Sequence, residues 1–437
     1  MRKAGNPGTD TAMSRSSTSS FDDVPALPPL IGDAPGAHNA DDVTPGDIAV
    51  GVVIGRASEY FDFFVYGIAS VLVFPALFFP SLSRLEGTLY SFLIFSFAFV
   101  ARPLGTMLSM AVQRRWGRGT KLTIALFLLG TATVCIAFLP GYETAGRLSI
   151  ALLAFNAPKG RRGWYAMLGQ LGAPLGFIIA AALFAYLYSS LPVGEFLDWG
   201  WRFPFFVAFA INVVALFARL RLVVGQSYAD ALQARELEPV SVTEVMSNQG
   251  TSVFLGAFAA LASLALFHLV TVFPLSWISM YSEQSMVDVL NVQMVGAVFA
   301  AGAIVISGTL ADKVGRRNLL GTMAVLIGVF SLAAPFLLKA GSTGNNIFIL
   351  AGFILLGLSY GQSSGTVTNN FTSHFRYTGA ALSNDLAWLI GAAFAPRVAL
   401  GLSAKFGLMA VTLYLLSAVV CTLLALRINR VLEQREA

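Results

Sequence analysis

Three charged residues at a spacing of three stand inside an otherwise apolar stretch near the start of the chain. They are Arg56, Glu59 and Asp62, and residues three apart lie on one face of a helix. At the centre of a membrane helix a charge costs at least about 2.5 kcal/mol on insertion scales, so charges retained there usually serve a purpose. The three residues form either a proton-accepting set that lines a cavity or a structural ion network that only fixes the helix.

Three more ionisable residues lie in or beside apolar runs. Arg102 precedes a proline and either attracts an anionic substrate or anchors its helix by snorkelling. His268 is the sole ionisable residue in its apolar run apart from a terminal Tyr. It either titrates near neutral pH or packs as a hydrogen-bonded residue. Asp385 lies well inside an apolar helix, and the roughly 18 Å of helical rise to Arg397 excludes a pair, so we expect it to line a cavity.

The composition excludes a soluble protein. Hydrophobic residues make up 56% of the 437 residues and charged residues only 12%, whereas soluble chains carry about 25% charged residues. The two cysteines, Cys135 and Cys421, both lie in apolar runs, and the three histidines are scattered, so we expect neither a disulfide framework nor a metal site. Because the chain has no nucleotide-binding motif, catalytic triad or cofactor fingerprint, we expect no enzyme, no cofactor and no nucleic-acid partner.

From residue 48 onward, apolar runs of spanning length alternate with short polar loops. A span needs about 20 apolar residues to cross about 30 Å of hydrocarbon. The polar stretch 225–249 separates two groups of runs and predicts an all-α polytopic fold of two helical bundles, 48–224 and 250–426, with a disordered tail at 1–47 and a second tail at 427–437. The eleven runs are 48–78, 86–112, 121–140, 163–189, 203–224, 250–279, 288–311, 318–338, 346–369, 378–400 and 406–426.

Basic residues mark alternate loops, which predicts cytoplasmic loops and two cytoplasmic termini by the positive-inside rule. The loop at 190–202 instead carries Glu195 and Asp198 and is expected on the other side. The basic clusters are Arg114, Arg115, Arg118 and Lys121, then Lys159, Arg161 and Arg162, then Arg219 and Arg221, then Lys313, Arg316 and Arg317, and finally Arg427 and Arg430.

The fourth helix of the first bundle is short. Between Pro140 and Lys159 the only apolar piece is residues 148–155, which as a helix covers about 12 Å, under half the membrane. An even number of spans would place every basic loop on one side, and eleven does not. We therefore expect eleven full spans plus one stub near 146–158, instead of twelve.

Two stretches in equivalent places of the two halves resemble a known loop. Residues 308–317 read GTLADKVGRR, which is similar to the G-x-x-x-D-x-x-G-R-[RK] loop of the major facilitator superfamily. In the first half Arg114 stands where that family places Asp. Small glycines allow close helix packing, and the charged residues can pair with each other or with a helix end. The expected gating residues are Gly308, Asp312, Gly315, Arg316, Arg317 and, in a later stretch, Arg376.

The sequence of the first span narrows the resemblance to one family within that superfamily. Residues 59–67 read EYFDFFVYG and resemble the E-[WYF]-[YF]-D-F-F-x-Y-G segment of the metabolite:proton symporter family within that superfamily. That family usually has an uncharged residue at the position of Arg56, so this chain departs from it there. Further similar stretches are RPLG at 102–105, QLGAPLG at 170–176, WGWRFP at 199–204 and RYTGA at 376–380.

The resemblance implies a secondary transporter in the cytoplasmic membrane that moves a small polar metabolite with protons by alternating access. Its partners would be the substrate, protons and the lipid bilayer, and we expect a monomer. The family's organic acids, with Arg56 and Arg102, favour a carboxylate, while the aromatic residues near Tyr60 and Phe61 could hold a quaternary ammonium group. The alternative function is a transport-impaired membrane protein retained as a sensor or scaffold, because the fourth helix is short.

Overall fold

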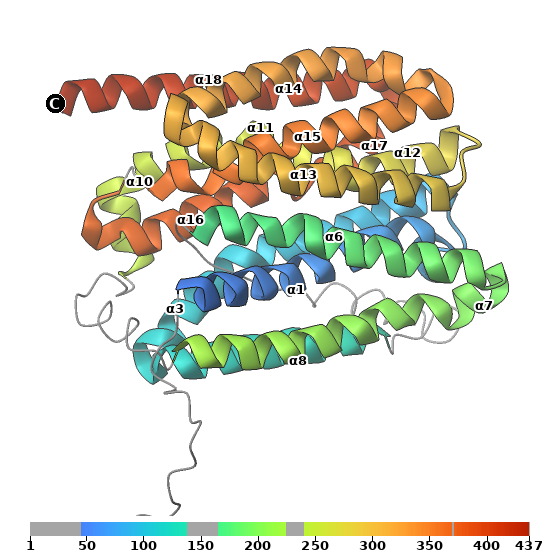
Figure 1. Cartoon of the computed structure of the whole chain (residues 1–437), viewed down its shortest axis with the longest axis horizontal. Coiled ribbons are helices and arrows are strands. Elements are labelled where there is room, and N and C mark those ends of the chain that lie inside the picture. The colour runs from blue at the N-terminus through green and yellow to red at the C-terminus, as the bar shows by residue number, and fades with distance from the viewer. Residues whose placement is uncertain (1–44, 138–164, 224–239, 369–370, 437) are drawn as a thin grey trace, which may run out of the picture. The chain divides into compact units, whose positions relative to one another are not determined.

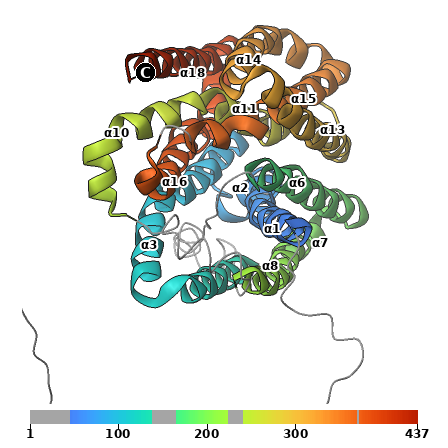
Figure 2. The same ribbon diagram turned by 60° about the vertical axis from the view of Figure 1, so that its left-hand side comes forward.

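The computed structural model of the chain describes residues 45–137, 165–223, 240–368 and 371–436, and every regular element in these ranges is a helix. The helices lie side by side in two bundles (Figures 1 and 2). The stub expected near 146–158, the tail at 1–44 and residues 224–239 of the central loop lie outside the described residues.

The first bundle contains three long helices that pack around α1, which itself contacts α3, α6 and α8. The short helix α2 follows α1, and two short elements, α7 and η1, connect α6 to α8. The bounds are α1 (Pro45–Leu72), α2 (Phe74–Phe78), α3 (Arg84–Ala137), α6 (Tyr165–Ser190), α7 (Val193–Asp198), η1 (Gly200–Arg202) and α8 (Phe203–Val223).

The second bundle contains two spans that are broken into shorter helices. Its first span consists of three consecutive pieces, and its fifth consists of two. Figure 2 shows α13, α14, α15 and α18 on the far side of the molecule from α8. The bounds are α10 (Val242–Ala259), α11 (Leu261–Thr271), α12 (Phe273–Tyr281), α13 (Met286–Val314), α14 (Arg316–Lys339), α15 (Gly341–Thr368), α16 (Ser373–Gly391), α17 (Ala395–Phe406) and α18 (Leu408–Glu436).

Each of the eleven apolar runs overlaps a helix or a chain of helices. Eight helical segments of the described residues are long and apolar enough to cross a membrane. The 28-residue helix α1 is also of spanning length, although it carries four charged residues.

The loop expected between the runs 86–112 and 121–140 is helical, so that prediction was wrong. Helix α3 continues through it for 54 residues. The intervening residues 113–120 contain no proline, and their three Arg and one Gln favour a helix although their two Gly do not. A cluster of basic residues therefore marked a change in polarity and not the end of a helix.

The central loop is shorter than predicted, because α10 begins at Val242 and not near residue 250. The Glu244 backbone N–H donates to Ser241 Oγ over 3.3 Å and caps the new helix. The spacing Ser-x-x-Glu from Ser241 to Glu244 is a recognised helix start, so the sequence carried this signal. The helix then kinks at Gln249, whose φ is −134° and ψ is 28°.

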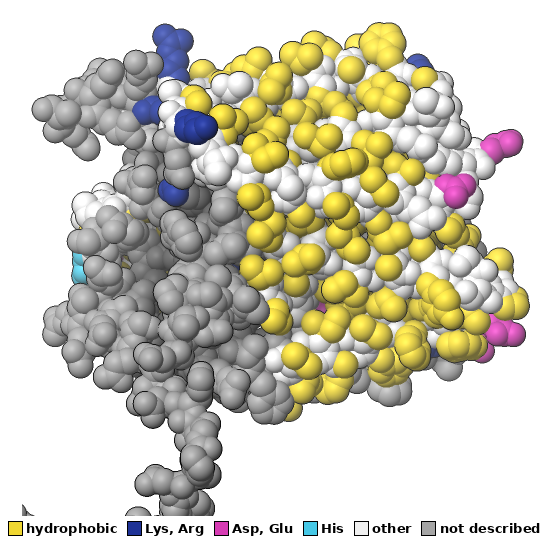
Figure 3. Space-filling view, viewed as in Figure 1, with side chains coloured by type: hydrophobic (Ala, Val, Ile, Leu, Met, Phe, Trp, Pro, Cys, Tyr) yellow, Lys and Arg dark blue, Asp and Glu magenta, His cyan; other side chains and the backbone are white. Residues whose placement is uncertain are grey.

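The surface has an apolar belt, with the acidic side chains gathered at one end and most of the visible basic side chains at the other (Figure 3). Helix α13 runs from the acidic end to the basic end: exposed Glu283 precedes it, and exposed Lys313 lies in its last turn. Its 29 residues cover about 43 Å, which is enough to cross the hydrocarbon layer. The distribution is that of a membrane protein with two chemically different water-facing ends.

Two glycines bring α6 directly against the backbone of α1. A Cβ added to Gly172 would lie 2.5 Å from Arg56 Cβ, and one added to Gly176 would lie 2.7 Å from the Ala57 carbonyl oxygen. Real Cβ atoms do not approach other atoms so closely, so both positions require glycine. The QLGAPLG stretch at 170–176 therefore fixes the position of α1 and of the charged residues that it carries.

Candidate functional site

Helix α1 carries an ion pair between a partly buried arginine and a buried carboxylate, at the positions that the sequence predicted. Arg56 Nη1 lies 3.0 Å from Glu59 Oε2, and the Glu59 side chain is 2% exposed. Asp62, one turn further on, accepts hydrogen bonds from Asn212 Nδ2 of α8 at 2.9 and 3.2 Å. The structure thus brings Arg56 and Glu59 together, while Asp62 bonds to the neighbouring helix.

Asn212 was not among the predicted site residues. It is buried in α8, within the apolar run 203–224. A polar amide inside such a run was the available signal, because buried polar side chains are almost always hydrogen-bonded.

Next to the ion pair, Tyr60 of α1 joins the two bundles. Its hydroxyl is hydrogen-bonded to the hydroxyl of Tyr360 on α15, across 300 residues of sequence. The Tyr60 ring also lies 6.1 Å from the ring of Phe267 and 6.3 Å from that of Trp388, both in the second bundle. We call Tyr60, Phe64, Phe99, Phe267, Tyr360 and Trp388 the aromatic layer.

His268 borders the aromatic layer from α11. It is 1% exposed, and its ring lies 5.4 Å from Phe95 and 5.8 Å from Phe99, both on α3 of the other bundle. Neither ring nitrogen has a hydrogen-bond partner among the residues that the structure describes. The sequence suggested a packing histidine with a hydrogen bond. The described residues supply the packing but not the hydrogen bond.

Asp385 lies on α16, one helical turn before Trp388 of the aromatic layer, and is 7% exposed. Arg397 lies on α17 and donates through Nη1 to the Leu89 carbonyl oxygen of α3 at 2.6 Å. Arg102 is part of α3, but its side chain is outside the described atoms.

A second set of contacts joins the bundles where the fifth span of the second bundle is broken. The guanidinium of Arg397 lies 6.0 Å from the centre of the Tyr90 ring. Ser96 Oγ, also on α3, donates to the Ala393 carbonyl oxygen at 2.7 Å. Pro396 at the start of α17 breaks the helix, which leaves carbonyl groups for partners outside it. We call the contacts of Arg397 and Ser96 with α3 and the α16–α17 break the bundle latch.

Five of the six predicted gating residues lie in or beside the junction of α13 and α14, and the sixth, Arg376, lies on α16. Gly315 connects the two helices with φ of 85°, a conformation that favours glycine. Arg317 Nη2 donates to the Leu426 carbonyl oxygen of α18 at 2.5 Å, so this arginine ties the turn to another helix. Gly308 belongs to α13 and Arg316 begins α14; the side chains of Asp312 and Arg376 lie outside the described atoms.

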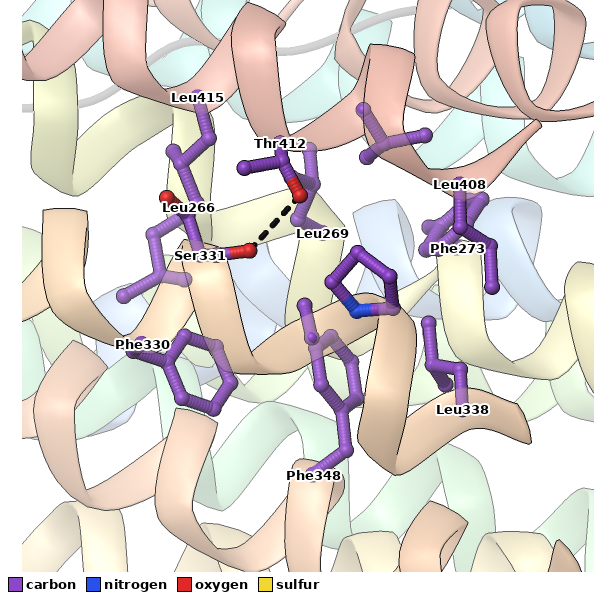
Figure 4. Close-up of a pocket in the computed structure, with 13 residues that line it drawn as sticks. Leu266, Leu269, Phe273, Phe330, Ser331, Leu338, Phe348, Leu408, Thr412 and Leu415 are labelled. Carbon is purple, nitrogen blue, oxygen red and sulfur yellow. Dashed lines mark hydrogen bonds between the residues drawn. The ribbon is translucent and has the colours of Figure 1, made fainter. Parts of the chain in front are cut away.

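Two apolar pockets lie near this site. One is between the bundles and is lined by Phe64, Phe177, Phe267, Phe353 and Tyr360, among others. The other lies inside the second bundle (Figure 4), where Thr412 Oγ1 donates to the Ser331 carbonyl oxygen at 2.8 Å. No charged residue lines either of these two pockets.

Comparisons with known proteins agree with this arrangement. Residues 148–396 match the family described as the Major Facilitator Superfamily. The chain is 33% identical to the inner membrane metabolite transport protein YhjE of Escherichia coli, over 87% of this chain and 92% of that protein. It is 27% identical to the shikimate transporter of Escherichia coli, over 82% of this chain and 88% of that protein. It is 26% identical to the proline/betaine transporter of the same species, over 77% and 74%.

Solved structures show the same fold. The D-xylose-proton symporter superposes with a TM-score of 0.65 at 15% identity, covering 88% of this chain and 97% of that one. A bacterial homologue of the human lysosomal transporter Spinster gives a TM-score of 0.57 at 14% identity, covering 90% and 98%. With two helical bundles, a family match over more than half its length and relatives above 30% identity, this chain belongs to the Major Facilitator Superfamily.

Proposed function

We propose that the protein is a secondary transporter that moves a small polar metabolite across the cytoplasmic membrane with protons, by alternating access of its two bundles. The observation that carries the proposal is the Arg56–Glu59 pair beside the Tyr60–Tyr360 contact. Charged and polar groups cost free energy inside a membrane protein, and those that are retained often mark a substrate or proton pathway. Relatives with metabolite, shikimate and proline/betaine transport in their names support the same function.

The orientation follows from the charged ends. We propose that both termini and the basic end, which includes Lys313, lie in the cytoplasm, as the positive-inside rule predicts. Helix α3 then begins at the outer side, and the bundle latch is the outer closure between the bundles. Substrate enters from outside only when Arg397 and Ser96 release their partners, and the turn at Gly315 and Arg317 lies on the inner side.

Protons would reach the buried carboxylates of the first bundle. Glu59 is paired with Arg56, so a proton on Glu59 would break the ion pair and free the guanidinium for another anion. A substrate carboxylate is such an anion, which makes binding of the two partners mutually favourable. Asp62, Asp385 and the side chain of Arg102 complete the proposed pathway.

The substrate class we propose is a carboxylate. Shikimate, proline and betaine, which appear in the names of relatives, all carry a carboxylate group. The aromatic layer would hold the remaining part of such a molecule, including a quaternary ammonium group where one is present.

The test is uptake by purified protein in proteoliposomes. Radiolabelled shikimate, proline and glycine betaine are offered under an imposed proton gradient, with and without a protonophore. We expect the gradient to drive accumulation, and Glu59→Gln to abolish accumulation while leaving exchange of substrate for substrate. Glu195→Gln, an exposed carboxylate on α7, is the matched control and should behave as wild type. Uptake that is unchanged by the protonophore would contradict proton coupling.

A second candidate function rests on the short fourth helix. Only residues 148–155 are apolar between Pro140 and Lys159, and a broken topology there would leave a membrane protein that senses or binds a partner without transporting. Equal uptake with and without the protein, across the whole substrate panel, would favour this candidate.

A further inference from the structure

Helix α11 is an isolated piece of a broken span in the middle of the molecule. All eleven of its residues, Leu261–Thr271, are buried. Broken helices inside a membrane protein are tolerated where other groups satisfy the freed backbone, and in transporters they often form the substrate site.

Side chains from other helices fill both breaks that bound α11. At its start, Thr422 Oγ1 of α18 accepts from the Ala262 N–H at 2.9 Å and donates to the Phe258 carbonyl oxygen at 3.0 Å. At its end, Pro274 removes one helical bond, and Gln293 Nε2 donates to the carbonyl oxygens of Val270 and Thr271 at 3.2 and 2.8 Å. These four backbone groups are thus hydrogen-bonded within the protein, without a ligand.

His268 differs from these backbone groups, because its two ring nitrogens are buried without a hydrogen-bond partner among the described residues. Its ring is 1% exposed, and both Nδ1 and Nε2 have no hydrogen-bond partner among the described residues. Four aromatic rings surround it, from Phe95, Phe99, Phe267 and Trp388, at centroid distances of 5.2 to 6.5 Å. A buried polar group without a partner costs free energy, and a hydrocarbon side chain would fill this space without that cost.

We propose that His268 is a substrate-binding residue, and that its imidazole forms a hydrogen bond to an oxygen atom of the transported metabolite when the bundles separate. The proposal rests on the proposed transport function. Opening the bundles moves Phe95 and Phe99 of the first bundle away from one side of the ring, while Phe267 stays beside it on α11. The exposed ring edge then faces the space that a substrate occupies.

The chemistry of the site defines the ligand group. A neutral imidazole offers one N–H donor and one acceptor nitrogen. A carboxylate oxygen can take the donor, whereas a hydroxyl group can take either nitrogen. The aromatic faces of Trp388 and Phe267 suit an apolar ring or chain beside that oxygen. His268 would therefore select small oxygen-bearing metabolites from the second bundle.

The competing explanation is packing alone, in which the surrounding ring faces receive the imidazole N–H. The two explanations differ for an aromatic replacement without nitrogen. If His268 only packs, His268→Phe keeps the ring contacts and transports normally. If His268 binds substrate, the same variant folds and loses affinity.

The experiment compares His268→Phe and His268→Asn with wild type in proteoliposomes, using whichever of shikimate, proline and glycine betaine the wild type takes up. Thermal unfolding of each variant confirms that it folds. We expect His268→Phe to raise KM about tenfold, as loss of one hydrogen bond does, with a smaller change in kcat. His268→Asn, which keeps a donor and an acceptor, should recover part of the loss. His374→Gln, at an exposed histidine, is the control.

The outcomes separate the two proposals. Wild-type uptake with an unchanged KM in His268→Phe overturns the role of His268 and leaves the transport function standing. A wild type that neither takes up nor is thermally stabilised by any of the three compounds overturns both. If KM rises for shikimate but not for glycine betaine, which has no hydroxyl group, the bond is to a hydroxyl; a rise for both indicates the carboxylate.

A measurement that keeps His268 guards against misfolded variants. In a background with His38→Gln and His374→Gln, diethyl pyrocarbonate can modify only His268 among the histidines, and mass spectrometry follows the modification. We expect a transported substrate to slow it. Modification at an unchanged rate under saturating substrate would overturn the proposal.

Discussion

Removing the Arg397 side chain from the bundle latch should open the outer side of the transporter. Its guanidinium donates to the Leu89 carbonyl oxygen at 2.6 Å and lies 6.0 Å from the Tyr90 ring centre, and both partners belong to the other bundle. We therefore expect Arg397→Met to destabilise the closed conformation relative to the open one.

The size of the effect follows from these two contacts. A hydrogen bond from a charged group is worth about 1.5–3 kcal/mol, and the lower value applies here because Arg397 is only half-buried. The cation–π contact with the exposed Tyr90 ring adds about 0.5 kcal/mol. A total near 2 kcal/mol corresponds to about a thirtyfold change in the ratio of closed to open molecules.

Electron–electron double resonance can measure this ratio. Spin labels are attached at Arg84→Cys and Ala404→Cys, two exposed positions at the outer end of different bundles, in a background without Cys135 and Cys421. Arg397→Met should shift the distance distribution from the short to the long population. Lys339→Gln, at an exposed cation of the same bundle, should not. An unchanged distribution in Arg397→Met would show that the latch does not hold the bundles closed.

Three further predictions concern the first bundle. Asn212→Leu should lower stability by about 1–3 kcal/mol in thermal unfolding, because it leaves the buried Asp62 without its amide donor; an unchanged melting temperature would show that the bond is dispensable. Gly176→Leu should give no monodisperse protein in size-exclusion chromatography, because its Cβ would lie 2.7 Å from the α1 backbone, whereas Gly194→Ala has open space and should behave as wild type. A single cysteine at Gly160 should be shielded from an impermeant thiol reagent in intact cells; labelling from outside would show that the first bundle has an altered topology.

Local features of the site could be predicted from the sequence. The spacing of Arg56 and Glu59 on one helical face predicts their ion pair, because residues three apart on a helix are neighbours. The apolar runs predict the helices for the same kind of reason, since a span needs a length of apolar residues that can be counted.

Partners that are distant in the sequence could not be predicted. Asn212 lies 150 residues from Asp62, and Tyr360 lies 300 residues from Tyr60. No periodicity within one helix indicates which residue of another helix faces it, because that depends on how both helices are rotated in the bundle. The continuity of α3 was missed for a different reason: a run of polar residues without proline does not by itself end a helix.

The hydroxyl of Thr422 fixes how the second bundle can deform. The hydroxyl bridges the Ala262 N–H and the Phe258 carbonyl oxygen. The break before α11 is therefore held by hydrogen bonds to α18 and is not a free hinge. A tilt of α11 about this point would break the two hydrogen bonds of Thr422 unless α18 moved with it. We therefore expect a displacement of α11 at the centre of the molecule to move α18 as well.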